Sequence, residues 1–177
     1  PLRIALRSLP RVEVQHVAPS ESLAPRRMAR RFDAIIFSDF SAARVPAATQ
    51  RLLVEHVQGG SGFGMIGGWA SFTGSQGGWS GSLLEQLLPV RCLRRDDRRA
   101  FPTGALVTPV RSHALLSSGW FRQPPAICGL NEVRLLPDSL VLLRAQPILG
   151  AVRASNGSAR VQLARRSYPV LVLHADP

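Results

Sequence analysis

The first half of the chain alternates apolar runs with turn-forming residues, as expected for a strand–helix–strand unit. Residues 33–39 (DAIIFSD) are an unbroken apolar run between two acids, which predicts a buried parallel strand. Residues 46–57 predict a helix that opens with Pro46 and is closed by Gly59 and Gly60. Residues 63–66 then predict the next buried strand.

Further elements are predicted on both sides of this unit. Residues 2–9 carry a helix-like apolar face, and residues 12–17 predict a short strand. A glycine-rich loop, residues 67–81, follows the second strand. Ser82 and Glu85 then have the spacing of a capping box at the start of a short helix.

The second half of the chain predicts mainly strands. Asn156-Gly157 predicts a turn between two of them. The order of elements favours an α/β fold, with a mostly parallel sheet extended by antiparallel strands, in a single domain over residues 1–177. The predicted strands are 132–136, 140–144, 148–153 and 170–174.

The charge balance is strongly basic, with 22 arginines, no lysine and 11 acids, for a formal net charge of +11. Nucleic acid is an unlikely partner, because the arginines are scattered and no RNA-reading aromatic motif accompanies them. The more one-signed patch, which suggests a phosphate-binding hypothesis, consists of Arg26, Arg27, Arg30 and Arg31. No apolar run is long enough to predict a membrane span.

The cysteine and glycine patterns match no cofactor-binding motif, and we expect no cofactor. Cys92 and Cys128 form neither a disulfide framework nor the paired spacing of a zinc site, which suggests a reducing, cytoplasmic location. Residues 62–67 match G-x-G-x-x-G, but these glycines lie before and within a strand, so a dinucleotide site is not predicted. Because the sequence starts at Pro1 within a structural element, we expect it to begin inside a larger polypeptide.

The strongest candidate site is the loop over residues 67–74. It follows a buried strand at the carboxyl edge, where open α/β sheets bind ligands. Glycines there would let backbone N–H groups approach an anion, and aromatic side chains would shape a pocket or, alternatively, cover the sheet edge as core. The expected ligand-binding residues are Gly67, Gly68, Trp69, Ser71 and Phe72, with Asp39 at the end of the neighbouring strand.

Several of these stretches, taken in order, resemble the class I glutamine amidotransferase-like proteins, in a branch of unknown function. The resemblance implies a flavodoxin-like three-layer fold. It is looser at Gly129-Leu130-Asn131 and at residues 170–177, and the family's first strand and extreme C-terminus are expected to be missing. The stretches that carry it are 33–39, Gly59-Gly60, 65–68 with Ser71, Phe72 and Gly74, and 82–90.

The resemblance also implies where a nucleophile would stand. In active relatives a cysteine follows the strand equivalent to residues 63–66, on a sharp turn. Here that turn falls at Gly67 or Gly68, which have no side chain to attack an amide. Neither Cys92 nor Cys128 aligns with the turn, so we predict no glutaminase activity through a thioester.

Three functions remain open from the sequence. The first is a module that binds a small ligand or a protein partner at the 67–81 loop. The second is an enzyme of different chemistry, such as a hydrolase or transferase, using Ser71, His113 or Asp39 in the same cleft. The third is a basic domain that interacts with nucleic acid. Self-association into a homo-oligomer is also left open.

Overall fold

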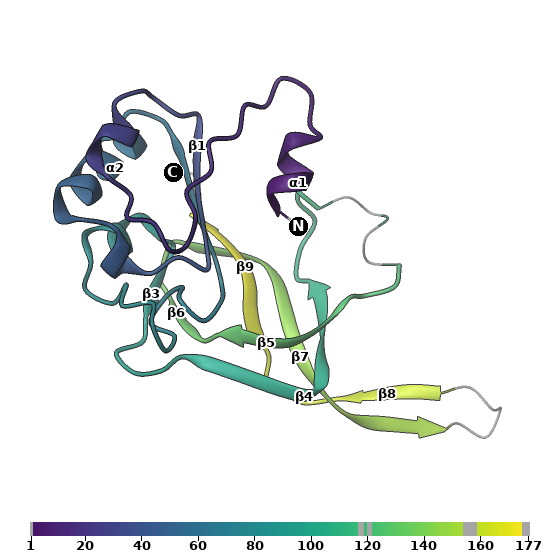
Figure 1. Cartoon of the computed structure of the whole chain (residues 1–177). Helices are drawn as coiled ribbons and strands as arrows, with labels where there is room; N and C mark the ends of the chain where they lie inside the picture. Colours follow the sequence, from purple (N-terminus) through teal and green to yellow (C-terminus); the bar gives the residue numbers. More distant parts are fainter. Residues whose placement is uncertain (1, 117–118, 120–121, 154–158, 175–177) are drawn as a thin grey trace.

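The computed structural model describes residues 2–116, 119, 122–153 and 159–174. It contains a parallel strand pair with one long helix, followed by antiparallel strands (Figure 1). The α/β class predicted from the sequence is therefore found. The helices and strands are α1 (Leu2–Arg7), β1 (Ala34–Ser38), α2 (Ala47–Gln58), β2 (Gly62–Ile66), β3 (Val90–Cys92), β4 (Arg98–Pro109), β5 (Ala126–Asn131), β6 (Val133–Leu135), β7 (Ser139–Arg153), β8 (Ala159–Leu163) and β9 (Tyr168–His174), and the short 3₁₀ turns are η1 (Pro25–Met28), η2 (Ala42–Arg44) and η3 (Leu83–Leu87).

The β1–α2–β2 unit confirms the strand–helix–strand prediction. β1 and β2 pair in parallel, with Ala34 opposite Gly62 and Ser38 opposite Ile66. The helix α2 supplies Leu53, which is fully buried, to the same core as Phe37 of β1. Parallel neighbours need a crossover of a dozen or more residues, and the α2 segment provides it.

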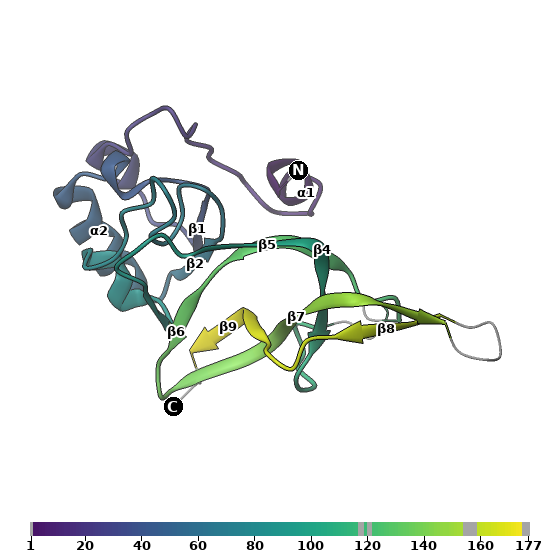
Figure 2. The same cartoon turned by 90° about the horizontal axis from the view of Figure 1, so that it is seen from below.

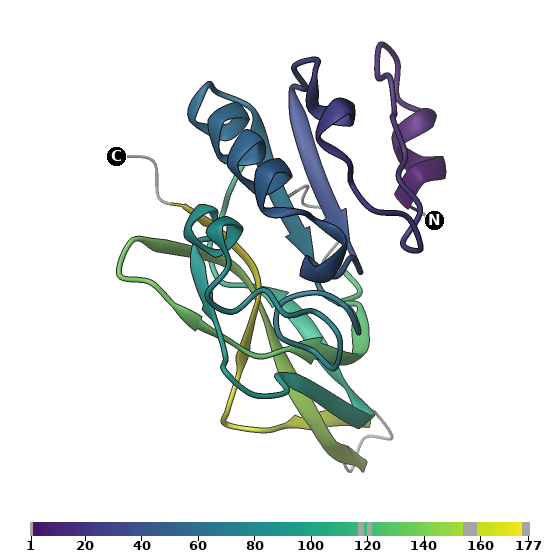
Figure 3. The ribbon, with the colours of Figure 1, turned by 60° about the vertical axis from the view of Figure 1, so that its left-hand side comes forward.

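The opposite face of this strand pair is open. Side chains alternate along β1, so Phe37 points into the core while Ile36 is 43% exposed. Ile66 of β2 is 44% exposed. The helix α1 lies across β1 from α2 (Figures 1 and 3), and none of its residues is buried.

The second half forms antiparallel sheets, which corrects the expectation of a mostly parallel sheet. Five strands pair in the order β5–β4–β7–β8, with β9 also on β7, and β3 pairs with β6. Among the described residues, no helix follows β3, so these strands have no helical crossover and pair antiparallel. The β7–β8 ribbon projects away from the rest of the fold (Figures 1 and 2).

Two of the strand predictions were wrong, one in the existence of a strand and one in its division. Residues 12–17 form no strand, because the segment has no neighbouring strand to pair with there. Residues 140–144 and 148–153 belong to one continuous strand, β7, in which Pro147 is accommodated opposite Ala105. The predicted Asn156-Gly157 turn lies outside the described residues.

The prediction of a capping box formed by Ser82 and Glu85 was also wrong. The Ser82 side chain makes no cap hydrogen bond at η3. Glu85 reaches elsewhere: its Oε2 accepts from the Gly81 N–H at 2.7 Å and its Oε1 from the Cys92 N–H at 2.7 Å. This buried carboxylate therefore ties η3 to β3.

Two hydrophobic clusters fill the molecule. The larger lies between α2, the inner face of β1–β2, η3 and β3, and the smaller lies within the antiparallel sheet. Val133 of β6 and Val172 of β9 pack against the larger cluster, so the antiparallel strands contribute to it. Within the described part of the chain, no helix is long and apolar enough to cross a membrane.

Candidate functional site

The carboxyl ends of β1 and β2 meet through Asp39 and Ser71. The Asp39 N–H donates to Ser71 Oγ at 3.1 Å, and the Ala70 N–H donates to Asp39 Oδ1 at 2.6 Å. The Ser71 hydroxyl donates to the carbonyl of Ile66 at 2.6 Å. Ser71 is fully buried and both its donor and an acceptor site are engaged, so its role in this conformation is to hold the loop.

Asn131, at the end of β5, fastens the turn that follows β2. Its Oδ1 accepts from the Gly68 N–H at 2.9 Å, and its Nδ2 donates to the Gly68 carbonyl at 3.1 Å. Nδ2 also donates to Asp97 Oδ1 at 2.7 Å. The Gly68 N–H, which was expected to face an anion, is thus bound within the protein.

Asp97 anchors the next part of the loop. Its carboxylate accepts from the Thr73 N–H at 2.7 Å and from the Gly74 N–H at 3.0 Å. Only 2% of the residue is exposed. A buried carboxylate is tolerated where several donors satisfy it, and three do so here, counting Asn131.

The sequence did not identify Asp97 or Asn131 as site residues. Asp97 lies in the mixed-charge run 94–99, which is typical of a solvated surface. Asn131 had one signal, the resemblance of Gly129-Leu130-Asn131 to a family motif. What gives both residues a role is β-pairing between β4 and β5, which brings Arg98 opposite Asn131.

The turn at Gly67 and Gly68 has no room for a side chain. A Cβ on Gly67 would lie 2.7 Å from Asn131 Oδ1, and one on Gly68 would lie 2.6 Å from Asp39 Cγ. Real Cβ atoms do not approach other heavy atoms so closely. The space that a side chain at Gly67 or Gly68 would occupy is therefore taken by Asn131 and Asp39.

The backbone around this turn adopts left-handed conformations at two residues other than glycine. Asp39 has φ +53° and Phe72 has φ +49°. This region is disfavoured for residues with a Cβ, most of all for bulky ones. Surrounding hydrogen bonds hold it in place, including one of 3.0 Å from the Trp79 N–H to the Phe72 carbonyl.

The three aromatic residues of the loop have different environments. Trp79 is fully buried and its Nε1 donates to the Phe40 carbonyl at 2.9 Å, so it is core. Phe72 is half-buried against the same core. Trp69 is 68% exposed, and the Arg98 guanidinium lies 4.5 Å from its ring centroid.

Asp96 holds that arginine over the indole. The carboxylate accepts from Arg98 Nη2 at 2.6 Å and from Nε at 2.9 Å. This hydrogen bonding lowers the pKa of Asp96 to about 2. The pair remains charged at neutral pH, so Trp69 presents an indole backed by a fixed cation.

His113 makes its described contacts away from Asp39 and Ser71. It lies in the turn after β4, where its Nδ1 accepts from the Leu115 N–H at 3.1 Å. Of the three catalytic candidates, the structure brings only Asp39 and Ser71 into contact.

Neither thiol lies on the Gly67–Gly68 turn. Cys92 is buried in β3, and burial, followed by the Glu85 carboxylate, raises its pKa to about 12. Cys128 is exposed on β5. Within the ranges that the structure describes, no three His, Cys, Asp or Glu side chains are placed to hold a metal ion.

Comparison with known proteins gives a family. No curated protein matches the sequence. Among solved structures, Cytoplasmic Protein STM3548 from Salmonella typhimurium is 25% identical with a TM-score of 0.60, over 68% of this chain and 54% of that one. Cytoplasmic Protein STM1381 from Salmonella typhimurium LT2 is 24% identical with a TM-score of 0.69, over 82% of this chain and 69% of that one, and shows a shared fold.

This chain thus spans about half the length of the first of these two structures. The family described as "Putative glutamine amidotransferase" matches residues 11–159, which is most of the sequence. The resemblance stated from the motifs is therefore confirmed, and the chain belongs to this glutamine amidotransferase-like family.

Proposed function

We propose that this chain is a binding module built on a glutamine amidotransferase-like fold, without thioester glutaminase chemistry. A small ligand or a protein partner would bind at the loop 67–81, with Trp69 as its main contact. The observation that carries the proposal is the filled turn: Asn131 and Asp39 occupy the places of a Gly67 or Gly68 side chain.

The thiol chemistry supports the first half of the proposal. A thioester route needs an accessible thiolate. Cys92 is buried with a raised pKa, and Cys128 lies on β5, away from the turn that the family uses. A serine alternative through Ser71 is less well supported, because its hydroxyl is buried and donates to Ile66.

The loop geometry supports the second half. Strained backbone persists where the surrounding structure over-determines it, and such strain clusters at functional sites. Asp39 and Phe72 are strained in this way beside an exposed tryptophan. Tryptophan and arginine dominate binding energy at protein interfaces, and Trp69 with Arg98 offers both.

The proposal also covers the domain organisation, the fold type and the cellular location of the protein. We place the chain in one domain over residues 1–177, since strands of the second half pack on the core of the first. The β1–α2–β2 unit would be the flavodoxin-like part, with α1 on the second face. A cytoplasmic location is proposed from the names of the two structural neighbours, both of which are called cytoplasmic proteins.

A ligand-observed NMR screen tests the binding site. Aromatic and carboxylate fragments would be screened against wild-type protein, Trp69→Ala and the matched control Leu149→Ala, which removes an apolar side chain of similar exposure from the projecting ribbon. We expect hits whose signals disappear with Trp69→Ala and persist with Leu149→Ala. Hits that survive in Trp69→Ala would place binding elsewhere and contradict the proposed site.

A further inference from the structure

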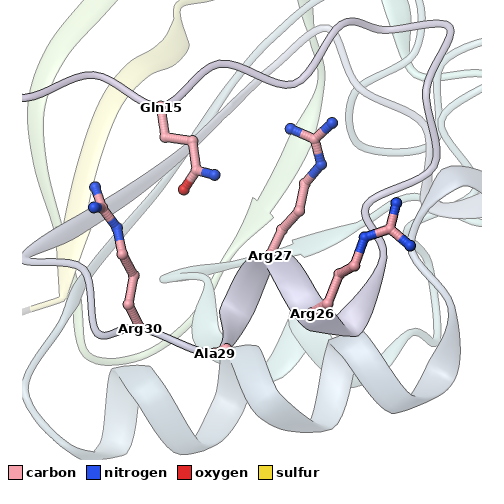
Figure 4. A pocket seen from close by; sticks show the side chains of 5 residues that line it. All are labelled: Gln15, Arg26, Arg27, Ala29 and Arg30. Carbon is pink, nitrogen blue, oxygen red and sulfur yellow. The ribbon is translucent and has the colours of Figure 1, made fainter.

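A basic hollow lies beside the η1 turn (Pro25–Met28). It holds about 400 Å³ and is lined by Gln15, Arg26, Arg27, Ala29 and Arg30. The side chains of Arg26 and Arg27 come from the η1 turn and that of Arg30 from the segment just after it, while Gln15 points toward them from the preceding segment (Figure 4).

Contacts with α2 hold the backbone that carries these arginines. Met28 of η1 is buried in the larger core, and the ring Nε2 of His56 on α2 lies 3.1 Å from the Met28 carbonyl. The Thr49 hydroxyl, also on α2, donates to the Leu23 carbonyl at 2.8 Å. A ligand would therefore meet backbone that is already positioned, which lowers the cost of binding.

Two acids orient two of these arginines and use only some of their hydrogen-bond donors. Glu21 pairs with Arg27 Nη2 at 2.8 Å, and Glu13 pairs with Arg30 Nη2 at 2.6 Å. A guanidinium has five N–H donors, so each arginine keeps its other nitrogens. Arg26 has no acidic partner within 4 Å among the residues that the structure describes.

We propose that this hollow binds the phosphate group of a small phosphorylated ligand. The planar guanidinium fork matches phosphate oxygens, and charge-assisted hydrogen bonds of this kind are the strong ones. Three such guanidinium groups and the Gln15 amide line this hollow, and residues 1–31 carry seven arginines against two glutamates. The volume suits a small molecule. This site is separate from the proposed Trp69 surface and does not depend on it.

Calorimetric titration of the full chain with inorganic phosphate, pyrophosphate and adenosine monophosphate tests the proposal. Saturable binding at millimolar concentration or tighter is expected for at least one probe. The double variant Arg26→Gln/Arg30→Gln should weaken it at least tenfold. Arg134→Gln, which removes an exposed charge on β6, should change it less than twofold.

The acids give a second, independent readout. Glu13→Gln and Glu21→Gln should each tighten phosphate binding about threefold, because each removes a negative charge that competes for one of the lining arginines. Thermal unfolding of each variant checks that it is folded. The proposal is overturned by the absence of binding to all three probes, or by equal losses in Arg134→Gln and the double variant.

Discussion

The side chain of Asn131 and the peptide of Gly68 form a two-way hydrogen-bonded pair, with Oδ1 accepting at 2.9 Å and Nδ2 donating at 3.1 Å. Asn131 also donates to the buried Asp97, so one amide joins the end of β5 to both halves of the loop. A strand far along the sequence thus fixes the turn that follows β2.

Asn131→Ala should lower the free energy of unfolding by about 1–3 kcal/mol, because it removes both partners of the half-buried Gly68 peptide and one of the three donors to the buried Asp97 carboxylate. Asn131→Asp keeps the acceptor but sets a second carboxylate against Asp97 in place of a donor. Its stability deficit should therefore be larger at neutral pH than at about pH 4. Urea unfolding at both pH values measures this; equal stability of all three proteins would show that the bridge contributes nothing.

Gly68→Ala and Gly64→Ala form a matched pair. A Cβ on Gly68 meets the Asp39 side chain, whereas one on Gly64 meets nothing within 4 Å. We expect Gly68→Ala to cost about 1–3 kcal/mol of stability through overpacking. Gly64→Ala should be neutral or stabilise by about 0.5–1 kcal/mol, because glycine is unfavourable within a strand. The reverse order in denaturant unfolding would mean that the turn is not filled as described.

The sequence predicted the first half of the fold because its signals there are local. The apolar run 33–39 and the helix opened by Pro46 each report on one element, and both are found. β4 was missed, since it opens on Arg98-Arg99 and contains Pro102 and Gly104, residues that argue against a strand. Pairing with β5 and β7 overrides those local preferences.

The candidate site shows the same contrast between local sequence signals and long-range strand pairing. Sequence position alone indicated the loop after β2, because ligands bind at strand ends in α/β sheets. The environments of its aromatics could not be inferred, since Trp69 and Trp79 have similar local sequence yet opposite exposure. Asp97 and Asn131 become site residues only through long-range strand pairing.

The two tryptophans should respond very differently to truncation. Trp79→Ala empties a fully buried site and removes a hydrogen bond to Phe40, so a loss of about 3–5 kcal/mol is expected. Trp69→Ala touches an exposed side chain and should cost less than about 0.5 kcal/mol. Thermal unfolding of the two variants distinguishes them. A large loss in Trp69→Ala would assign that residue to the core and remove it as a contact surface.

The thiols should differ in reactivity. Iodoacetamide at mildly alkaline pH should modify the native protein once, at the exposed Cys128, and twice in denaturant. Mass spectrometry of tryptic peptides locates the adducts. Modification of native Cys92 at a comparable rate would contradict its burial.

Cys92 also predicts a pH dependence. Its pKa rises from about 9 to about 12 on folding, chiefly through burial. The neutral thiol is thus favoured in the folded state, so its contribution to stability is complete below pH 9 and is lost as pH rises toward 12. Relative to wild type, Cys92→Ala should lose less stability over this window; parallel curves for the two proteins would exclude the effect.

Ammonia release from glutamine tests most directly whether the filled turn excludes thioester chemistry. The account predicts no release above that of heat-denatured protein, and no glutamyl adduct on Cys92 or Cys128 by intact-mass spectrometry. Release that is accompanied by such an adduct, and that disappears when the modified cysteine is replaced by alanine, would contradict it.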